Sequence, residues 1–173
     1  MALVTSKELL LDAQKGGYAV GAFNVENMEM VMAVLAAAEE TSSPVIMQTT
    51  PGTIRFAGLD YYFANVRAAA ERTKIPVVMH LDHGDSLSMA MQAYRTGYTS
   101  IMIDGSKLPF EDNIALTKTV TDACHPANIP VEGELGKVGG KEDDLENEDG
   151  SPYTDPDEAA VFVARTNVDF LAV

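Results

Sequence analysis

The sequence alternates repeatedly between short apolar runs and segments with helical periodicity, and this alternation limits the possible folds more than any other feature. Three of the runs open with proline, which suits the first residue of a strand. Several are apolar almost throughout, as expected for parallel strands that are buried on both faces. The six runs span residues 19–25, 44–48, 76–82, 100–104, 130–136 and 169–173.

Helical patterns fill the segments between these runs. Apolar residues recur at helical spacing from Met28 to Leu35 and from Leu59 to Val66. An opening helix is predicted over residues 6–15, and Asp155 followed by a proline predicts a capped helix start. We expect the methionine-rich helix faces to fill the core rather than to form a cofactor surface, because methionine packs well in irregular cores. These residues are Met28, Met32, Met89 and Met91.

The order of one helix, then repeated strand–helix units, predicts an α/β fold of parallel strands with right-handed crossovers. A doubly wound sheet and a (β/α)8 barrel both fit this order. The turn FNVEN after the first run contains no glycine, which argues against a dinucleotide-binding turn. In either architecture the ligand is expected at the carboxyl ends of the strands.

Composition narrows the classes of partner. The formal charge of −14 and the isoelectric point near 4.4 argue against nucleic acid, whose phosphates require basic side chains. The chain of 173 residues is long enough for a single domain, predicted here over 1–173. We expect a cytoplasmic protein with no membrane segment, because the apolar stretches are short and interrupted, no signal peptide is evident and there is one cysteine.

Each predicted strand ends in polar residues, and these would converge on one mouth of a barrel. They are Asn24; Gln48, Thr49 and Thr50; Asp82 and His83; Asp104 and Ser106; and Glu132 and Glu134. Acids and histidines at successive strand ends suit a metal ion, which needs neutral imidazole and carboxylates facing one point. The sequence therefore predicts a possible metal site, without a reaction.

The stretch MHLDHGD, at positions 79–85, contains most of the histidines of the chain. Strand alternation places His80 and Asp82 on one side and His83 on the other, so both Asp82 and His83 face the mouth only if the strand breaks. Gly84 is predicted to supply this break. His80, deeper in the strand, is predicted to be a hydrogen-bonded core residue. His125 should lie at the opposite end of the barrel.

A long connection runs over residues 136–155, first glycine-rich, then acidic and turn-forming. Loops in such units usually have about 2–6 residues. Long loops at this end of a barrel are commonly lids, so a lid is preferred here over a solvated acidic loop without a role.

Six motifs stand out, in this order along the chain: GYAVGAFNVEN, SPVIMQTTPGT, MHLDHGDS, SIMIDGSKLPFEDN, VEGELGKVGGKEDD and YTDPDEAAVFV. Together they resemble the class II, zinc-dependent ketose-bisphosphate aldolases. The resemblance implies a (β/α)8 TIM barrel, of which about six units are present, and reversible cleavage of a ketohexose 1,6-bisphosphate into dihydroxyacetone phosphate and glyceraldehyde 3-phosphate. The TPGT and IDGS motifs favour tagatose over fructose bisphosphate.

The resemblance also implies roles for individual residues. His83 matches a ligand of the catalytic Zn²⁺, and Asp104 and Glu134 match residues around a more buried position of that ion. Asp82 matches the acid/base at the C4 hydroxyl, and Glu142 the loop acid that exchanges a proton at C3. Asn24, Thr49, Gly139 and Gly140 are expected near the substrate, its phosphate and a monovalent cation, Na⁺ or K⁺.

In the family, further zinc-ligand histidines and the rest of the phosphate site follow the sixth strand, beyond the position of Val173. We therefore expect the chain to be part of a longer barrel, inactive alone, with a non-catalytic barrel-family subunit as the alternative. A homo-oligomer is expected, and the tagatose branch adds a companion subunit as a further partner.

Overall fold

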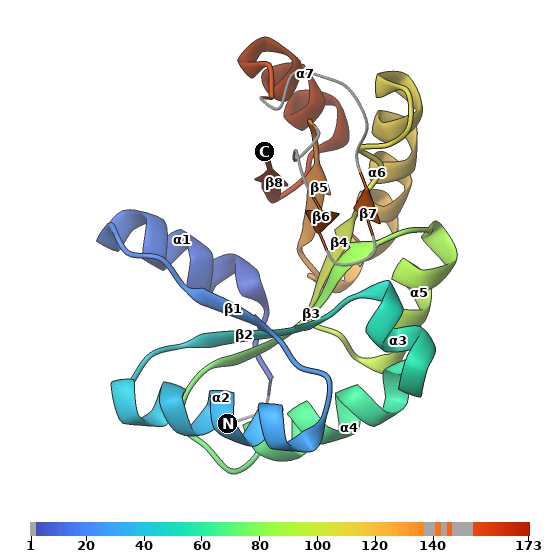
Figure 1. Cartoon of the computed structure of the whole chain (residues 1–173). Helices are drawn as coiled ribbons and strands as arrows, with labels where there is room; N and C mark the ends of the chain where they lie inside the picture. The colour runs from blue at the N-terminus through green and yellow to red at the C-terminus, as the bar shows by residue number, and fades with distance from the viewer. Residues whose placement is uncertain (1–2, 137–140, 143–144, 147–153) are drawn as a thin grey trace.

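The computed structural model describes residues 3–136, 141–142, 145–146 and 154–173. Its main sheet has six parallel strands (Figure 1). They are β1 (Gly21–Asn24), β2 (Val45–Thr49), β3 (Val77–Gly84), β4 (Ser100–Ile103), β5 (Val131–Glu134) and β8 (Phe170–Ala172). All six predicted strands are confirmed, to within two residues at their ends.

Helices separate the strands as predicted. They are α1 (Ser6–Gly16), α2 (Met28–Thr41), α3 (Pro51–Ala57), α4 (Leu59–Ala70), α5 (Leu87–Thr96), α6 (Phe110–Cys124), a 3-10 turn η1 (His125–Ala127) and α7 (Pro156–Thr166). Asp155 caps α7 by accepting hydrogen bonds from the next turn, as the sequence indicates. Helix α3 was not predicted, although Thr50 as its cap and Pro51 at its first position are a recognisable start. None of the helices described here has both the length and the hydropathy needed to cross a membrane.

The strand order β1-β2-β3-β4-β5-β8 decides between the two architectures. A doubly wound sheet reverses its order at a switch point, whereas a barrel adds each strand beside the previous one. Here each strand pairs with its predecessor, and each large helix from α4 to α7 contacts the helix before it. The sheet is therefore a curled part of a TIM barrel, with α2 and α4–α7 along its outer side (Figure 1).

Burial is greatest in the central strands. Val77, Val78, Met79 and Leu81 of β3 are fully buried, while three of the four residues of the edge strand β1 are exposed. The prediction that Met28 and Met32 fill the core is wrong, since their exposed fractions are 53% and 61%. Helix α2 lies beside the edge strand, so only one side of it is covered. Met89 and Met91 do pack against the core, as predicted.

A second small sheet pairs β6 (Lys141–Glu142) with β7 (Leu145–Glu146) in antiparallel fashion. It lies within the connection 136–155, for which a lid is predicted. Most of that connection lies outside the described residues, so the lid stays a prediction.

The amino ends of the strands are tied to α1 and η1 around Asp169. Its carboxylate accepts hydrogen bonds from Lys7 Nζ at 2.6 Å, from the Val131 N–H at 2.9 Å and meets His125 Nε2 at 2.9 Å. His125 therefore lies at the end of the barrel opposite to the strand carboxyl ends, as predicted. Burial would raise the pKa of Asp169, but the hydrogen bonds outweigh it and lower the pKa.

We expect Asp169→Asn to lower the free energy of unfolding by about 2 kcal/mol at pH 7, because a buried hydrogen-bonded charge loses its partners. The native pKa is depressed, so this contribution is present above the unfolded value near 3.8 and is lost as the pH falls through the native value. The difference between the parent chain and the variant should therefore shrink in urea unfolding at low pH. Asp122→Asn, which removes an exposed pair with Lys118, is the control, and its effect should stay below about 1 kcal/mol. Equal losses for both variants would contradict the account.

Candidate functional site

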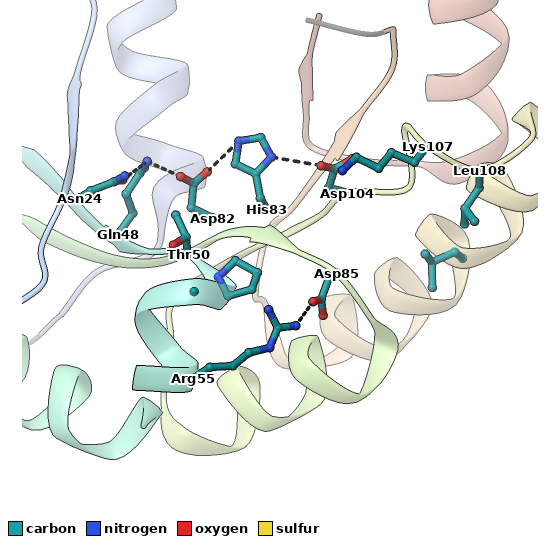
Figure 2. Close-up of a pocket in the computed structure, with 13 residues that line it drawn as sticks. Asn24, Gln48, Thr50, Arg55, Asp82, His83, Asp85, Asp104, Lys107 and Leu108 are labelled. Carbon is teal, nitrogen blue, oxygen red and sulfur yellow. Dashed lines mark hydrogen bonds and ion pairs between the residues drawn. The ribbon is translucent and has the colours of Figure 1, made fainter. Parts of the chain in front are cut away.

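A pocket of about 610 Å³ lies at the carboxyl ends of the strands. Its lining includes side chains from β1, β2 and β3 and from the loop after β4, among them Asn24, Gln48, Asp82, His83 and Asp104 (Figure 2). This is the end at which ligands bind in barrels of parallel strands. The polar strand ends predicted from the sequence therefore do converge.

A break at the end of β3 allows both Asp82 and His83 to face this pocket. The pairing with β4 shifts register between Leu81 and Gly84, and His83 has a φ of 48°, in the left-handed region. The break is thus centred on His83, whereas the sequence assigned it to Gly84. A β-bulge of this kind re-aims a side chain, here the imidazole of His83.

Gly84 has a different function at the bulge. A Cβ atom at this position would lie 2.5 Å from the carbonyl oxygen of Met102, so the two strands can approach only because the side chain is absent. The close approach is used by the Asp104 N–H, which donates to the Gly84 carbonyl oxygen at 2.9 Å. Gly84 therefore helps to fix Asp104 beside His83.

We expect Gly84→Ala to lower the free energy of unfolding by about 2–3 kcal/mol, because the backbone of Met102 must move. The same variant should weaken metal binding to the site, since the bulge positions both His83 and Asp104. Gly17→Ala is the control, because a Cβ atom at Gly17, which has a positive φ, would meet nothing within 4 Å. Its loss should be about 1 kcal/mol, without an effect on metal binding. Chemical unfolding and calorimetric titration with Zn²⁺ measure the two effects, and a tolerated Gly84→Ala would contradict this account.

Three of the predicted residues form one cluster: His83, Asp104 and Glu134. His83 Nδ1 lies 3.1 Å from Asp104 Oδ2 and 3.2 Å from Glu134 Oε2. Asp104 Oδ1 accepts hydrogen bonds from the backbone N–H and the hydroxyl of Ser106, at 2.9 and 2.7 Å. The cluster joins β3 to β5 across β4, so its side chains lie on the concave side of the sheet.

The charges within this cluster shift the pKa values of its members. The hydrogen bond to Asp104 and the nearby carboxylate of Glu134 raise the pKa of His83 to about 11. Burial would raise the pKa of Asp104, but its bonds to His83 and Ser106 lower it. Burial, together with the carboxylates of Asp82 and Glu134, raises the pKa of the neighbouring Glu132 to about 7. A proton on His83 thus holds together carboxylates that would otherwise repel each other.

The donor set of the cluster fits a divalent cation. One ligand atom from each of His83, Asp104 and Glu134 lies within 4.8 Å of the others. Glu134 Oε2 is buried and has no hydrogen-bond partner within the described part of the chain, although His83 Nδ1 lies 3.2 Å away. A cation at this position would satisfy that oxygen. Imidazole with carboxylates suits Zn²⁺ and related ions.

A row of hydrogen-bonded polar side chains leads from the end of β1 to the cluster. Gln48 Nε2 donates to Asn24 Oδ1 at 2.8 Å and to Asp82 Oδ2 at 2.7 Å. Asp82 Oδ1 in turn lies 3.9 Å from His83 Nε2, and Figure 2 shows this row along the mouth of the pocket. Gln48, one of the predicted polar strand ends but not assigned a role, therefore connects Asn24 and Asp82, which were predicted for substrate binding and for catalysis, beside the cluster.

The remaining predicted site residues either do not reach the pocket or have side chains outside the described part of the chain. Thr49 is fully buried and its hydroxyl is hydrogen-bonded to Tyr98 at 2.8 Å, so it does not reach the pocket. Strand alternation sends Gln48 to the concave side and Thr49 to the helices, while Thr50 lines the pocket instead. The backbone of Glu142 lies in β6, but its side chain lies outside the described residues, as do Gly139 and Gly140.

Sequence reasoning missed three charged residues at the rim of the pocket: Arg55, Asp85 and Lys107. Arg55 belongs to the unpredicted helix α3 and forms an ion pair with Asp85 (Figure 2). A helix predicted from the TPGT start would have placed Arg55 one turn above the end of β2.

Comparison with solved structures shows the same fold. The chain superposes on the YdjI aldolase from Escherichia coli K12 with a TM-score of 0.88 and 40% identity, covering 99% of this chain and 61% of that one. A candidate fructose-1,6-bisphosphate aldolase from Coccidioides immitis gives a TM-score of 0.85 and 30% identity, covering 95% of this chain and 58% of that one. Fructose-bisphosphate aldolase from Campylobacter jejuni gives 0.77 and 25%, covering 98% and 57%.

The chain thus spans about three fifths of the length of these structures. A family model described as "Fructose-bisphosphate aldolase class-II" matches residues 4–173. The match extends over nearly the whole chain and includes every strand of the main sheet. This chain belongs to the class II fructose-bisphosphate aldolase family.

Proposed function

We propose that this chain forms one partial barrel domain of an enzyme that reversibly cleaves a ketohexose 1,6-bisphosphate into dihydroxyacetone phosphate and glyceraldehyde 3-phosphate. The observation that carries the proposal is the position of Asp82 beside the cluster of His83, Asp104 and Glu134. Family membership supports aldol chemistry on a phosphorylated sugar. The motifs TPGT and IDGS favour tagatose over fructose bisphosphate.

In this proposal His83 is a ligand of the catalytic cation, for which Zn²⁺ is the candidate, and Asp104 and Glu134 lie around a more buried position of the same ion. Such a cation stabilises the negative charge that develops on substrate oxygens when the C3–C4 bond breaks. His83 contributes its Nδ1 atom, and Asp104 and Glu134 contribute carboxylate oxygens. Ser106 holds Asp104 in place through two hydrogen bonds.

Asp82 is the proposed acid/base for the C4 hydroxyl proton. One oxygen of its carboxylate accepts a hydrogen bond from Gln48, while the other faces His83. This fixed orientation is what proton transfer requires, since a base must lie within hydrogen-bond reach of its proton. Asn24, held by the same Gln48, is proposed to bind the substrate.

The connection after β5 supplies the remaining proposed functions. Glu142 would exchange the proton at C3, and Gly139 and Gly140 would lie at the phosphate with a monovalent cation, since glycine-rich backbone lets N–H groups approach an anion. A homo-oligomer, a companion subunit and a cytoplasmic location complete the proposal. The assignments of Glu142, Gly139 and Gly140 rest on the motif GKVGGKEDD.

The direct test is aldol cleavage by this chain, with tagatose and fructose 1,6-bisphosphate in parallel, each with added Zn²⁺ and with a chelator. Release of triose phosphate that depends on Zn²⁺ would support the proposal, and the faster substrate would identify the branch. Folded protein that binds Zn²⁺ but cleaves neither sugar would contradict activity in this chain.

A second candidate is a non-catalytic barrel-family subunit that binds sugar phosphate or a partner chain. The observation that favours it is the cluster itself, to which only one of the three histidines of the chain contributes. A catalytic zinc site commonly has three protein ligands with an open position, and carboxylates must here supply two of them. Binding of a sugar phosphate without cleavage would favour this candidate.

A further inference from the structure

A column of polar side chains crosses the interior of the sheet beneath the cluster, where barrels usually place apolar residues. Its members are Ser6, Ser100, His80 and Glu132. The first three are 2%, 1% and 5% exposed. Burying such groups is unfavourable unless their hydrogen bonds are made, so their connections decide what they can do.

The hydrogen bonds of this column favour one tautomer of His80. Ser6 Oγ donates to Ser100 Oγ at 2.8 Å, and Ser100 Oγ lies 2.8 Å from His80 Nδ1. Because the Ser100 oxygen accepts from Ser6, its own proton is available for His80 Nδ1. A neutral imidazole that accepts at Nδ1 carries its proton on Nε2. Burial lowers the pKa of His80 to about 3, which agrees with a neutral ring.

The Nε2 atom of His80 faces Glu132, whose Oε2 atom lies 3.6 Å away. His80 is in β3 and Glu132 is in β5, with β4 between them, so both side chains lie on the concave side of the sheet. Glu132 is two residues before Glu134, on the same side of β5. Its carboxyl group therefore lies one layer beneath the cluster of His83, Asp104 and Glu134.

We infer that His80 is a positioning residue for this cluster. Ser6 and Ser100 hold the His80 ring, and its Nε2 edge, 3.6 Å from Glu132 Oε2, positions that carboxyl group beneath the cation site. The chain of contacts begins in α1, which is docked by Ser6, by the Val4 N–H on the Val77 carbonyl oxygen and by Lys7 on Asp169. Docking of α1 is thereby coupled to the affinity of the cluster for a cation. The inference uses the cation site of the proposed function but does not require aldol cleavage.

Two amide substitutions of His80 separate positioning from packing. In His80→Gln the amide nitrogen lies near the former Nε2 position and can still donate to Glu132. In His80→Asn the amide oxygen lies near the former Nδ1 position and can accept from Ser100 only. Both side chains are polar and similar in size, so a packing role predicts similar behaviour for both.

The measurement is Co²⁺ binding to the full chain at pH 8, followed by the visible absorption of the bound ion, with unfolding in urea recorded for each variant. We expect His80→Asn and Glu132→Gln each to weaken Co²⁺ binding about tenfold, and His80→Gln to stay within about threefold of the parent. Combining His80→Asn with Glu132→Gln should add little to either single change, because both remove the same contact. His125→Gln, at the opposite end of the barrel, should leave the affinity and the spectrum unchanged.

Equal Co²⁺ affinities for His80→Asn and His80→Gln would overturn the inference, as would additive losses in the double variant. If a variant does not fold, nitrogen-15 spectra of the imidazole of His80 in the parent chain still decide. They should show a neutral ring with its proton on Nε2. A proton on Nδ1 instead would overturn the inference, whether or not the chain cleaves a sugar bisphosphate.

Discussion

Replacing His83 with alanine is expected to lower the Zn²⁺ affinity of the chain more than about 100-fold, the largest effect that we anticipate from a single substitution. His83 supplies the only nitrogen of the cluster, and its Nδ1 atom lies within 3.2 Å of both carboxylates. Changes outside the ligand shell typically weaken metal sites by about 10–100-fold, so loss of a ligand should exceed that range. Calorimetric titration with Zn²⁺ measures the effect.

The pH dependence of binding gives this prediction a second part. The carboxylates raise the pKa of His83 to about 11, so a cation must displace the proton from this ring below that pH. Zn²⁺ affinity of the parent chain should therefore rise about tenfold per pH unit through neutral pH, with one proton released per ion. The His83→Ala variant should lose this slope.

The stability of the metal-free chain should change with pH in the direction opposite to that of the Zn²⁺ affinity. The native pKa of His83 lies above the unfolded value of 6.5, so its contribution to stability is complete below pH 6.5 and declines as the pH rises toward 11. His125→Ala, which removes a histidine outside the cluster, is the control and should keep both the affinity and its slope. Tight, pH-dependent binding by His83→Ala would show that the cation binds elsewhere.

Asp82→Asn is expected to slow aldol cleavage about 10²–10⁴-fold while the Zn²⁺ affinity stays nearly unchanged. General acid–base catalysis contributes rate factors of about this size, and an amide cannot take up the proton. The variant should fold normally, because the amide oxygen of asparagine can still accept the hydrogen bond from Gln48. The measurement is release of triose phosphate at saturating Zn²⁺ by the longer enzyme of which this chain is proposed to form a partial barrel domain.

Asp85→Asn is the matched control for this experiment. Asp85 also lines the pocket, but it is 42% exposed and pairs with Arg55 rather than with the row of polar side chains. Its variant should keep most of the cleavage rate. If Asp82→Asn cleaves as fast as Asp85→Asn, another group transfers the proton. If Asp82→Asn instead loses Zn²⁺, Asp82 belongs to the metal site.

The hydrophobic periodicity of the sequence was sufficient to predict most of the strands and helices and their order. Buried parallel strands need almost continuous apolar runs, and only helices can connect them, so 76–82 and 100–104 were recognisable without a structure. Polar residues after these runs marked the strand ends and predicted a possible metal site, and the family resemblance then implied His83, Asp104 and Glu134 as its residues. Helix α3 was missed because seven residues provide too short a pattern for periodicity.

Burial at the edge of the sheet could not be read from the sequence. Met28 and Met32 have the spacing of a core face, but their exposure depends on what lies beside β1, and local pattern carries no information on that. Thr49 and Gln48 are neighbours at one strand end, and both look like site residues. Only the direction of the pleat, fixed by pairing with β3, sends Gln48 to the pocket and Thr49 to Tyr98.

By itself, then, the sequence determined the α/β class, the strand ends and the residue types at the mouth, because these depend on local hydrophobicity and on chain order. The tertiary structure decided that the strands add in sequence as in a barrel and that the bulge at His83 turns its ring toward Asp104 and Glu134. It also decided that Gln48 aligns Asn24 with Asp82. These features depend on distances between residues far apart in the chain, which follow from strand register and close backbone approach rather than from local pattern.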